Sequence, residues 1–324
     1  MTTWLGLITE WDASQITWIQ TSEPPPRGLV TADSTVLVGT CNWADHQDFY
    51  PPAVQSGERL RYYATFFPIV EVNTTFYGIP KPSVAKRWAE MTPPGFQFNV
   101  KAYRSLTMHE REDGKPRRPT DAEEDDFMAV LAPLRRAGKL RAVHYQFPPW
   151  FTATPANMDY ISELADKHPQ DQLIVEFRHR TWAEPARFDA ATELLEEAGI
   201  AYCIVDQPQL GSASMPPHLA VTTDQLAVLR MHGRNRKTWY KKGETSADRF
   251  DYLYSEEELV EWVPRINGLA DRAQEVHVLF NNNRSNYAVV NGLQMAGLLE
   301  LGYPSPGVMA EQRREGTQEE LPLD

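Results

Sequence analysis

The stretch Leu173–Trp182 reads LIVEFRHRTW, and its alternation decides how the chain folds. At the two-residue period of a β-strand, Ile174, Glu176 and Arg178 share one face and apolar residues share the other. An ordinary buried parallel strand is apolar throughout, whereas this one becomes charged on a single face towards its C-terminal end. Because buried charge is costly unless it is paired or hydrogen-bonded, the pattern requires polar partners elsewhere in the chain.

Similar strand-like runs recur from Val36 onward and alternate with helix-like segments. Gly138 and Gly199 stand where two helices would end, and Ser255 precedes an acidic first turn. Strands alternating with helices in this way predict an α/β fold, a TIM-type (β/α)8 barrel. A doubly wound open sheet is the alternative, but the chain has no GxGxxG turn. The predicted strands are Val36–Thr40, Ile69–Asn73, Phe96–Lys101, Ala142–Phe147, Leu173–Arg178, Ala201–Asp206, Ala227–His232 and Glu275–Asn281. The predicted helices are Gly57–Phe67, Ser83–Met91, Ala122–Ala137, Pro155–His168, Pro185–Ala198, Glu256–Leu269 and Asn286–Leu301.

The barrel is predicted to be a single domain, residues 36–303, with an N-terminal arm over residues 1–35 and a flexible tail over residues 304–324. Three tryptophans in the arm, Trp4, Trp11 and Trp18, fall seven residues apart. This spacing favours a helix that packs against the barrel over one that binds a partner. The composition of the tail predicts disorder.

Composition excludes several classes of protein. A formal net charge of −12 over 324 residues argues against broad nucleic-acid binding. Two cysteines, Cys41 and Cys203, make neither a disulfide scaffold nor a CxxC metal motif. The N-terminus lacks the features of a signal peptide, and no long uncharged apolar run follows. We therefore expect a cytoplasmic protein with no membrane association and no evident protein partner.

In a closed barrel, one face of each strand packs against the helices and the other points inward. Alternation predicts a polar interior near the C-terminal strand ends, where active sites of this fold lie. It places Cys203 and Val205 on the outer face. The alternative is a structural salt-bridge network, which we disfavour because ion pairs rarely stabilise better than apolar packing. The polar residues predicted to face inward are Glu71, Asn73, Asn99, Lys101, His144, Gln146, Glu176, Arg178, Asp206, Arg230, His232, His277 and Asn281.

A set of motifs at the strand ends resembles the YecE-like family, domain of unknown function 72, over roughly Val36 to Leu301. The resemblance implies a TIM-type barrel with its pocket built from these motifs, which adds Trp43, Asn73, Tyr77, Gln146 and Asn282 to the candidate ligand-binding residues. It implies no reaction. Cys41–Asn42 stands where the family commonly has Ser–Gly, which puts any role of Cys41 in doubt. The motifs are GTCNW at 39–43, FYPP at 49–52, EVNTTFY at 71–77, FQFNVKA at 96–102, QFPPWF at 146–151, VEFRHRTW at 175–182, LRMHGRN at 229–235, YSEEEL at 254–259 and VLFNNN at 278–283.

The loop after the seventh predicted strand indicates an anionic ligand. Residues 230–242 read RMHGRNRKTWYKK, with six cationic residues among aromatic ones. Loops after strands seven and eight of such barrels often bind phosphate, and the eighth strand here leads into a helix N-terminus. The alternative is a solvated loop in an acidic protein. The predicted ligand-binding residues from these patterns are Lys101, Arg178, Arg230, Arg234, Trp239, Asn281 and Asn282.

The candidate acids and bases for catalysis are Glu71, Glu176, Asp206 and His232. Glu176 is the preferred base, and His232 either acts as the acid or is structural. Cys41 is expected to be a buried thiol rather than a nucleophile. No metal site is predicted, because HxH and HExxH are absent and the cations of the ring would repel a metal. The sequence requires no cofactor, although a divalent metal remains an open alternative.

These observations predict an enzyme, a phosphoester hydrolase or lyase, at the C-terminal mouth of the barrel. Its substrate would be a nucleotide, a nucleic-acid end or a sugar phosphate, and its chemistry acid–base hydrolysis or elimination. One alternative is a noncatalytic barrel that binds an anionic ligand or single-stranded nucleic acid. Another is a glycosidase, with Glu71 and Glu176 near the far end of a separation range of about 5–10 Å.

Overall fold

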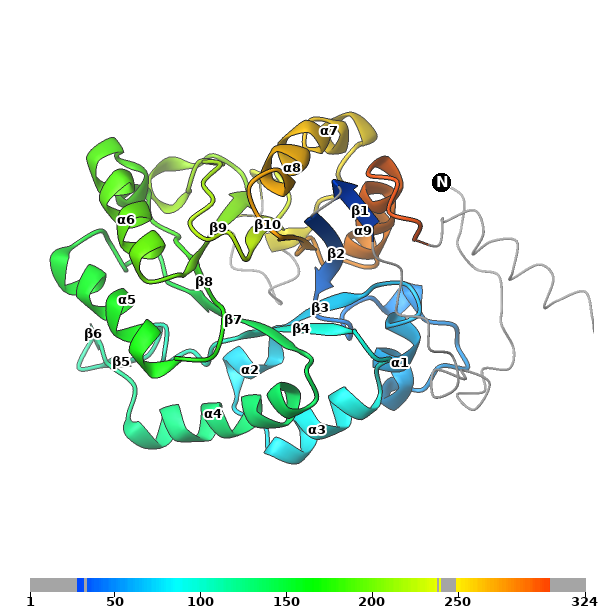
Figure 1. Ribbon diagram of the computed structural model, residues 1–324, viewed down its shortest axis with the longest axis horizontal. Helices are drawn as coiled ribbons and strands as arrows, with labels where there is room; N and C mark the ends of the chain where they lie inside the picture. The colour runs from blue at the N-terminus through cyan, green and yellow to red at the C-terminus, as the bar shows by residue number, and fades with distance from the viewer. Residues whose placement is uncertain (1–27, 32–33, 238, 240–248, 304–324) are drawn as a thin grey trace, which may run out of the picture.

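Eight parallel strands close into a barrel, because β2 pairs with β11 on one side and with β3 on the other. The computed structural model describes residues 28–31, 34–237, 239 and 249–303, and helices surround its strands (Figure 1). The predicted TIM-type barrel is confirmed, and each predicted strand differs from the observed one by at most two residues at either end. The barrel strands are β2 (Ser34–Cys41), β3 (Ile69–Val72), β4 (Gln97–Lys101), β7 (Leu140–Gln146), β8 (Leu173–Glu176), β9 (Ala201–Asp206), β10 (Ala227–Met231) and β11 (Glu275–Phe280).

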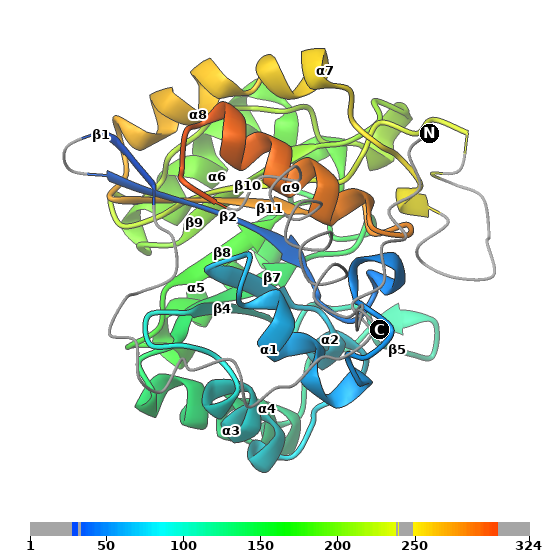
Figure 2. The same cartoon turned by 90° about the vertical axis from the view of Figure 1, so that its right-hand side faces the viewer.

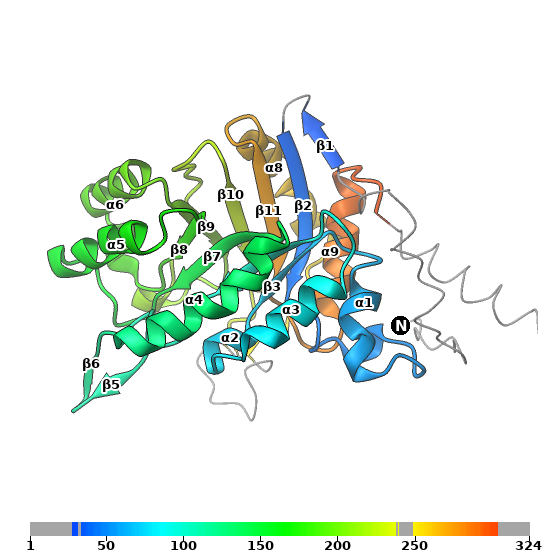
Figure 3. The same cartoon turned by 60° about the horizontal axis from the view of Figure 1, so that its bottom comes forward.

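A short strand, β1 (Gly28–Thr31), lies within the segment predicted as an arm and pairs antiparallel with β2 outside the barrel ring. A second hairpin, β5 (Arg111–Glu112) with β6 (Lys115–Pro116), belongs to the loop after β4. Figure 3 shows this hairpin at the end of the molecule towards which β2 runs. The predictions for the three tryptophans of the arm, the tail 304–324 and residues 240–248 lie outside the described residues.

The helices follow the strands along the chain and cover the outer face of the barrel (Figure 2). Thr120 and Ser255 begin two of them with capping boxes, in which each hydroxyl accepts from a backbone N–H three residues on. The single helix predicted over residues 256–269 is divided in two, because Pro264 stands in the first turn of the second part and has no N–H to continue the first. The α-helices are α1 (Arg59–Tyr63), α2 (Thr74–Tyr77), α3 (Pro82–Glu90), α4 (Asp121–Arg136), α5 (Pro155–Lys167), α6 (Pro185–Glu197), α7 (Glu256–Val260), α8 (Val263–Ala270) and α9 (Tyr287–Leu298). The 3-10 helices are η2 (Gln47–Phe49), η3 (Ser56–Glu58), η4 (Arg180–Ala183) and η5 (Gly211–Ala213).

Polar side chains close the N-terminal end of the barrel. Glu275 Oε1 lies 2.8 Å from Arg141 Nε and 2.6 Å from His277 Nε2, and Asn99 Nδ2 lies 2.9 Å from the other ring nitrogen of His277. Gln97 Nε2 donates to the same carboxylate at 3.4 Å. At this end of the barrel the inward polar residues form a structural network among themselves, separate from the polar residues predicted at the C-terminal strand ends.

Among the described residues, no helix combines the length and the hydrophobicity that crossing a membrane requires.

Gly39 marks the tightest approach between two barrel strands. A Cβ built at this position would lie 2.3 Å from the carbonyl oxygen of Ile69 on β3. We expect Gly39→Ala to lower the free energy of unfolding by about 1–3 kcal/mol, because backbone rather than a flexible side chain must move. Gly268→Ala in α8 is the control: its Cβ meets nothing within 4 Å, so a gain of about 0.5–1 kcal/mol is expected. Urea unfolding measures both changes, and equal stabilities of the two variants would contradict the expectation.

Candidate functional site

The barrel interior is organised around Arg230 of β10, which joins two buried carboxylates. Its Nη2 donates to Glu71 Oε1 at 2.6 Å, and its Nη1 donates to Glu176 Oε2 at 2.5 Å. Both glutamates are fully buried, and Arg230 is 1% exposed. One guanidinium therefore connects β3, β8 and β10 across the interior.

Further donors surround the same two carboxylates. His144 of β7 lies between them, with Nδ1 2.8 Å from Glu71 Oε2 and Nε2 3.4 Å from Glu176 Oε2. Gln146 Nε2 donates to Glu176 Oε1 at 2.6 Å, and Arg178 Nε donates to the same oxygen at 2.9 Å. Side chains from β7, β10 and the loop directly after β8 thus converge on Glu176, and the residues predicted from alternation on β3, β7, β8 and β10 do lie together.

The environment keeps both carboxylates ionised. Burial alone would raise the pKa of Glu71, but the Arg230 guanidinium and His144 hold it well below its usual range. For Glu176, burial is likewise outweighed by Arg230 and Arg178, so its pKa is also held well below the ordinary value. A carboxylate stabilised by this many donors is a weak base. Glu176, the preferred base in the sequence prediction, is better suited to holding the surrounding cations in place.

Lys101 and Arg178 lie on the accessible side of this interior cluster. Lys101 Nζ donates to Gln146 Oε1 at 2.8 Å and lies 4.5 Å from the centre of the Phe76 ring. Burial and then Arg230 lower the pKa of Lys101 to about 8. The side chain of Arg178 is 12% exposed and Lys101 is 9% exposed, so both remain reachable from the barrel mouth.

His232 is held in one tautomer. Asn281 Nδ2 donates to His232 Nδ1 at 2.9 Å, so the proton lies on Nε2, 3.2 Å from Glu176 Oε1. Burial and then the Arg178 charge lower the pKa of His232 to about 3. The ring is therefore neutral at physiological pH and donates to Glu176. Its sides face Trp239 and Phe250, with ring centres at 6.3 and 5.8 Å.

The analysis of the sequence missed His109, in the loop after β4. The Thr107 hydroxyl donates to the Arg104 carbonyl at 3.2 Å and so accepts from His109 Nδ1 at 2.8 Å, which leaves a lone pair on Nε2. Burial and then Lys101 lower the pKa of His109 to about 3. The ring lies 4.8 Å from that of Phe76, the same ring that Lys101 contacts. No strand alternation applies in an irregular loop, so no sequence pattern identifies this histidine.

The predicted orientation of β9 was wrong. In its parallel pairing Val205 lies beside the inward Arg230, so Cys203 and Val205 face inward and Asp206 faces the helices. Cys203 Sγ lies 3.8 Å from Glu176 Oε2, and Cys41 Sγ lies 3.4 Å from Arg230 Nη2. Burial raises the pKa of both thiols, which agrees with the expectation that Cys41 is an unreactive buried thiol.

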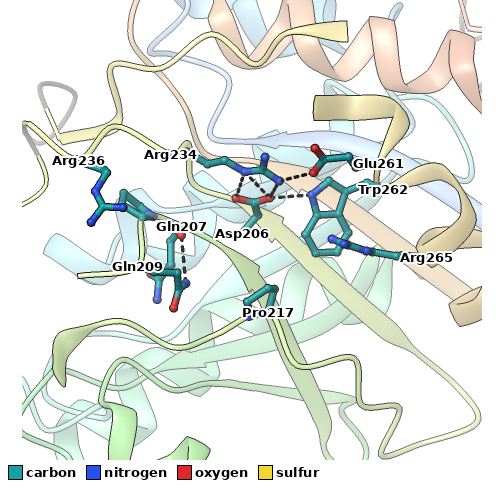
Figure 4. Close-up of a pocket in the computed structure, with 10 residues that line it drawn as sticks. Asp206, Gln207, Gln209, Pro217, Arg234, Arg236, Glu261, Trp262 and Arg265 are labelled. Atoms are coloured by element: carbon teal, nitrogen blue, oxygen red, sulfur yellow. Dashed lines mark hydrogen bonds and ion pairs between the residues drawn. The ribbon is translucent and has the colours of Figure 1, made fainter. Parts of the chain in front are cut away.

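Asp206 instead lines a cleft outside the barrel interior, with a volume of about 370 Å³ (Figure 4). It accepts hydrogen bonds from Trp262 Nε1 and from Arg234 Nη2, each at 2.7 Å. Arg234 also pairs with Glu258 and Glu261, at 3.3 and 3.2 Å. Asp206 and Arg234 therefore do not join the interior cluster. Alternation along the strand predicts that Asp206 faces inward. In the structure, the Trp262 indole and the Arg234 guanidinium satisfy its carboxylate on the outer side of the strand.

The remaining predicted ligand-binding residues divide between the mouth and its surroundings. Asn282 Nδ2 donates to Asn291 Oδ1 at 2.8 Å and so fixes its own loop. Trp43 packs against Trp88 with ring centres 5.7 Å apart, and Tyr77 is 65% exposed. Asn73 follows β3 directly and precedes α2. The predicted residues that converge at the mouth are Lys101, Gln146, Arg178, Arg230, His232, Trp239 and Asn281.

One triad in the described interior has the chemistry of a metal site. Donor atoms of His144, Glu176 and Cys203 lie within 4.8 Å of one another, a combination that zinc accepts. However, Arg230 already donates to Glu176 Oε2, and burial keeps the Cys203 thiol protonated by raising its pKa. A thiol ligand must be deprotonated, so these residues fit a cation poorly. That the site uses no metal stays a prediction.

The central guanidinium provides a direct test of this electrostatic balance. Arg230→Met should lower the free energy of unfolding by about 3–5 kcal/mol, because both glutamates lose their buried partner. Adding Glu71→Gln to that variant should restore part of the loss. Arg61→Met, which removes a part-exposed pair with Glu58, is the control, with an expected cost of about 0–1 kcal/mol. Urea unfolding of the four proteins checks this, and similar losses for Arg230→Met and Arg61→Met would contradict it.

The neutral His232 makes stability depend on pH. Its pKa of about 3 in the folded state lies below the ordinary value of 6.5, so the unfolded chain binds more protons between these values. Its stabilising contribution is present above pH 6.5 and is lost as pH falls, by up to about 1.4 kcal/mol per pH unit. We expect His232→Gln to reduce this slope by that amount in urea unfolding at a series of pH values. Identical slopes for the variant and the original chain would show that His232 does not titrate in this way.

Comparison with known proteins gives one consistent family. The family model described as protein of unknown function DUF72 matches residues 37–315. The UPF0759 protein YunF of Bacillus subtilis is 35% identical over 274 residues, which cover 83% of this chain and 96% of the relative. The UPF0759 protein YecE of Escherichia coli K12 is 27% identical over 192 residues, 58% of this chain and 65% of the relative.

Solved structures agree with this assignment. A DUF72 family protein of Thermotoga maritima is similar with a TM-score of 0.70 and 33% identity, over 82% of this chain and 99% of that one. A DUF72 family protein of Enterococcus faecalis is similar with a TM-score of 0.74 and 26% identity, over 83% and 97% of the two chains. The resemblance found in the strand-end motifs is thereby confirmed: the chain belongs to the DUF72 family.

Proposed function

We propose that this protein is an enzyme that acts on a phosphate-bearing substrate at the C-terminal mouth of its barrel. The observation that carries the proposal is the charge of the interior cluster. Lys101, Arg178 and Arg230 face two carboxylates, Glu71 and Glu176, so one positive charge has no carboxylate within the cluster. Such a charge in a site of low dielectric attracts an anion strongly.

The two accessible cations are suited to a phosphate group. Arg178 Nε donates to Glu176 Oε1 and Arg178 Nη1 donates to Gln207 Oε1, each at 2.9 Å. The plane of the guanidinium is therefore fixed before a ligand binds. A guanidinium of fixed orientation binds phosphate oxygens with little further loss of entropy. Lys101 supplies a second donor from β4. Binding energy is therefore available without displacing the interior glutamates.

Binding of phosphate would also turn His109 into a proton acceptor. Lys101 and Arg178 are among the charges that lower the pKa of His109. Phosphate offsets these charges, so the pKa of His109 rises towards its ordinary value when substrate binds. Its Nε2, which carries a lone pair, then acts as the general base for hydrolysis or elimination. This role replaces the one that the sequence analysis gave to Glu176.

The second candidate is a noncatalytic barrel that binds single-stranded nucleic acid, and aromatic rings at the mouth favour it. Arg178 lies 5.7 Å from the centre of the Trp239 ring, and Arg111 lies 4.3 Å from that of Trp150. Such pairs of arginine and aromatic rings suit stacked bases and the backbone between them. A glycosidase is less well supported. Glu71 and Glu176 bind the two terminal nitrogens of one guanidinium, and neither has the raised pKa that a general acid requires.

Lys101→Gln and Arg178→Gln test the proposed site. Each change removes a charged donor, so each should weaken binding of pyrophosphate, adenosine 5′-monophosphate and glucose 6-phosphate by about 10–100-fold. Arg265→Gln is the control, because Arg265 is a residue of α8 that lies over the Trp262 ring, outside the interior. Isothermal titration calorimetry with these three probes measures the effect. Equal losses in all three variants, or no binding of any probe, would contradict the proposal.

Turnover distinguishes the two candidates. Incubation of the same probes and a 5′-phosphorylated oligonucleotide, followed by chromatography of the products, should reveal one substrate that is consumed. Binding of the oligonucleotide that weakens steeply with salt, survives His109→Gln and occurs without any product would favour the noncatalytic alternative.

A further inference from the structure

Lys101 has the surroundings of an amine nucleophile rather than of a structural lysine. It stands at the C-terminal end of β4, and 9% of its surface is accessible. In the described part of the chain, its Nζ has one hydrogen-bond acceptor, Gln146 Oε1, and no carboxylate within ion-pair distance. An ammonium group can donate three hydrogen bonds, so this amine is poorly satisfied in its charged form.

A second lysine, Lys139, shows that a lowered pKa alone does not identify an amine nucleophile. Burial also lowers the pKa of Lys139 to about 8. Its Nζ, however, donates to Ala89 O and Thr92 O, each at 2.6 Å, and to Thr92 Oγ1 at 3.0 Å. All three protons of that ammonium group are used, and its partners lie in and just after α3, away from the mouth. Lys139 therefore holds a loop in place, whereas Lys101 faces the space where a substrate would enter.

The side chains next to Lys101 complete a site for carbonyl chemistry. Phe76 contacts both the Lys101 amine, at 4.5 Å, and the His109 ring, at 4.8 Å, so both groups flank one aromatic ring. Arg178 contributes a guanidinium from the adjoining part of the cluster. The mouth thus combines an amine, an acceptor nitrogen on His109 Nε2 and a phosphate-binding group.

We propose that Lys101 forms a covalent imine with the carbonyl carbon of a phosphate-bearing aldehyde or ketone. This inference rests on the proposed function and narrows its substrate to phosphorylated carbonyl compounds. It also favours lyase chemistry over simple hydrolysis of the phosphoester.

The step balances without an added oxidant or reductant. The neutral amine nitrogen adds to the carbonyl carbon, and the electron pair of the C=O bond moves to oxygen, which takes up a proton. That first proton on oxygen comes from solvent. The nitrogen gives a proton to His109 Nε2, and His109 returns it to the hydroxyl group of the resulting carbinolamine, which then leaves as water. The product is a protonated C=N bond. Because it keeps one positive charge at position 101, attraction for the phosphate is retained. It also withdraws electrons from the neighbouring carbon, which allows a bond there to break.

Reductive trapping tests the proposal. The full chain is incubated at about pH 8 with D-glyceraldehyde 3-phosphate and sodium cyanoborohydride, and modified lysines are located by peptide mass spectrometry. Modification of Lys101 should exceed that of the exposed Lys86 by about tenfold or more, because its pKa of about 8 leaves much of its amine neutral and Arg178 holds the phosphate of the probe near it. Lys139 should remain unmodified. Glycerol 3-phosphate should protect Lys101, and D-glyceraldehyde without phosphate should modify it much less.

Lys101→Arg separates this proposal from the proposed function, because it keeps the charge but removes the nucleophile. We expect trapping at this position to be lost, while glycerol 3-phosphate is still bound, more weakly than by the original chain but more tightly than by Lys101→Gln, because the positive charge remains. Binding of glycerol 3-phosphate with no enrichment of label at Lys101 would overturn the imine and leave phosphate binding intact. Absence of both binding and labelling would overturn both proposals.

Discussion

Two ionised carboxylates with no exposed surface are the feature on which the rest of this barrel depends. Each isolated buried charge would be prohibitively unfavourable, and the Arg230 guanidinium lies where it reaches both glutamates at once. The three groups come from β3, β8 and β10, which are far apart in the sequence and meet only when the sheet closes. Closure of the sheet into a barrel therefore also brings Arg230 into contact with Glu71 and Glu176, which compensates the buried charges. Any arrangement that shifted one strand by a residue would turn its charged side chain towards the helices.

The two ends of the barrel use polar groups differently. At the N-terminal end, Glu275, Arg141 and His277 satisfy one another and give a self-contained network. At the C-terminal end, the cations outnumber the carboxylates and the accessible members are Lys101 and Arg178. The same residue types thus satisfy one another at one end and leave a cation without a carboxylate of its own at the other. Among the described residues, aromatic rings lie against the cations of the C-terminal end: Phe76 against Lys101 and Trp239 against Arg178. This arrangement is consistent with a ligand that has both polar and planar parts.

Much of the fold could be predicted from the sequence, because strand alternation and turn residues are local signals. The charged face of Leu173–Trp182 identified the interior correctly for β8, and the hydrogen bonds of Glu176 with Gln146 and Arg230 extend that result to β7 and β10. The same logic failed for β9, where polarity alone cannot distinguish an inward carboxylate from one that an outer indole satisfies. His109 could not be found because its loop has no period. Similarly, helix 256–269 was predicted as one element since its apolar spacing continues across Pro264. The orientation of individual side chains at the mouth depends on tertiary contacts that no local pattern records.

The orientation of the Gln146 side-chain amide is set by the opposite charges on its two sides. Its carbonyl oxygen faces the Lys101 amine and its NH2 group faces Glu176, at 2.8 and 2.6 Å, so its amide dipole points one way between a cation and an anion. A neutral spacer with opposite ends is the one kind of side chain that both neighbours accept. Glutamate at this position would confront the existing carboxylate, and lysine would confront the existing amine. The Gln146 amide also separates Lys101 from Glu176, so the two do not form a direct ion pair. The amine is therefore stabilised by a nearby negative charge without donating a hydrogen bond to it.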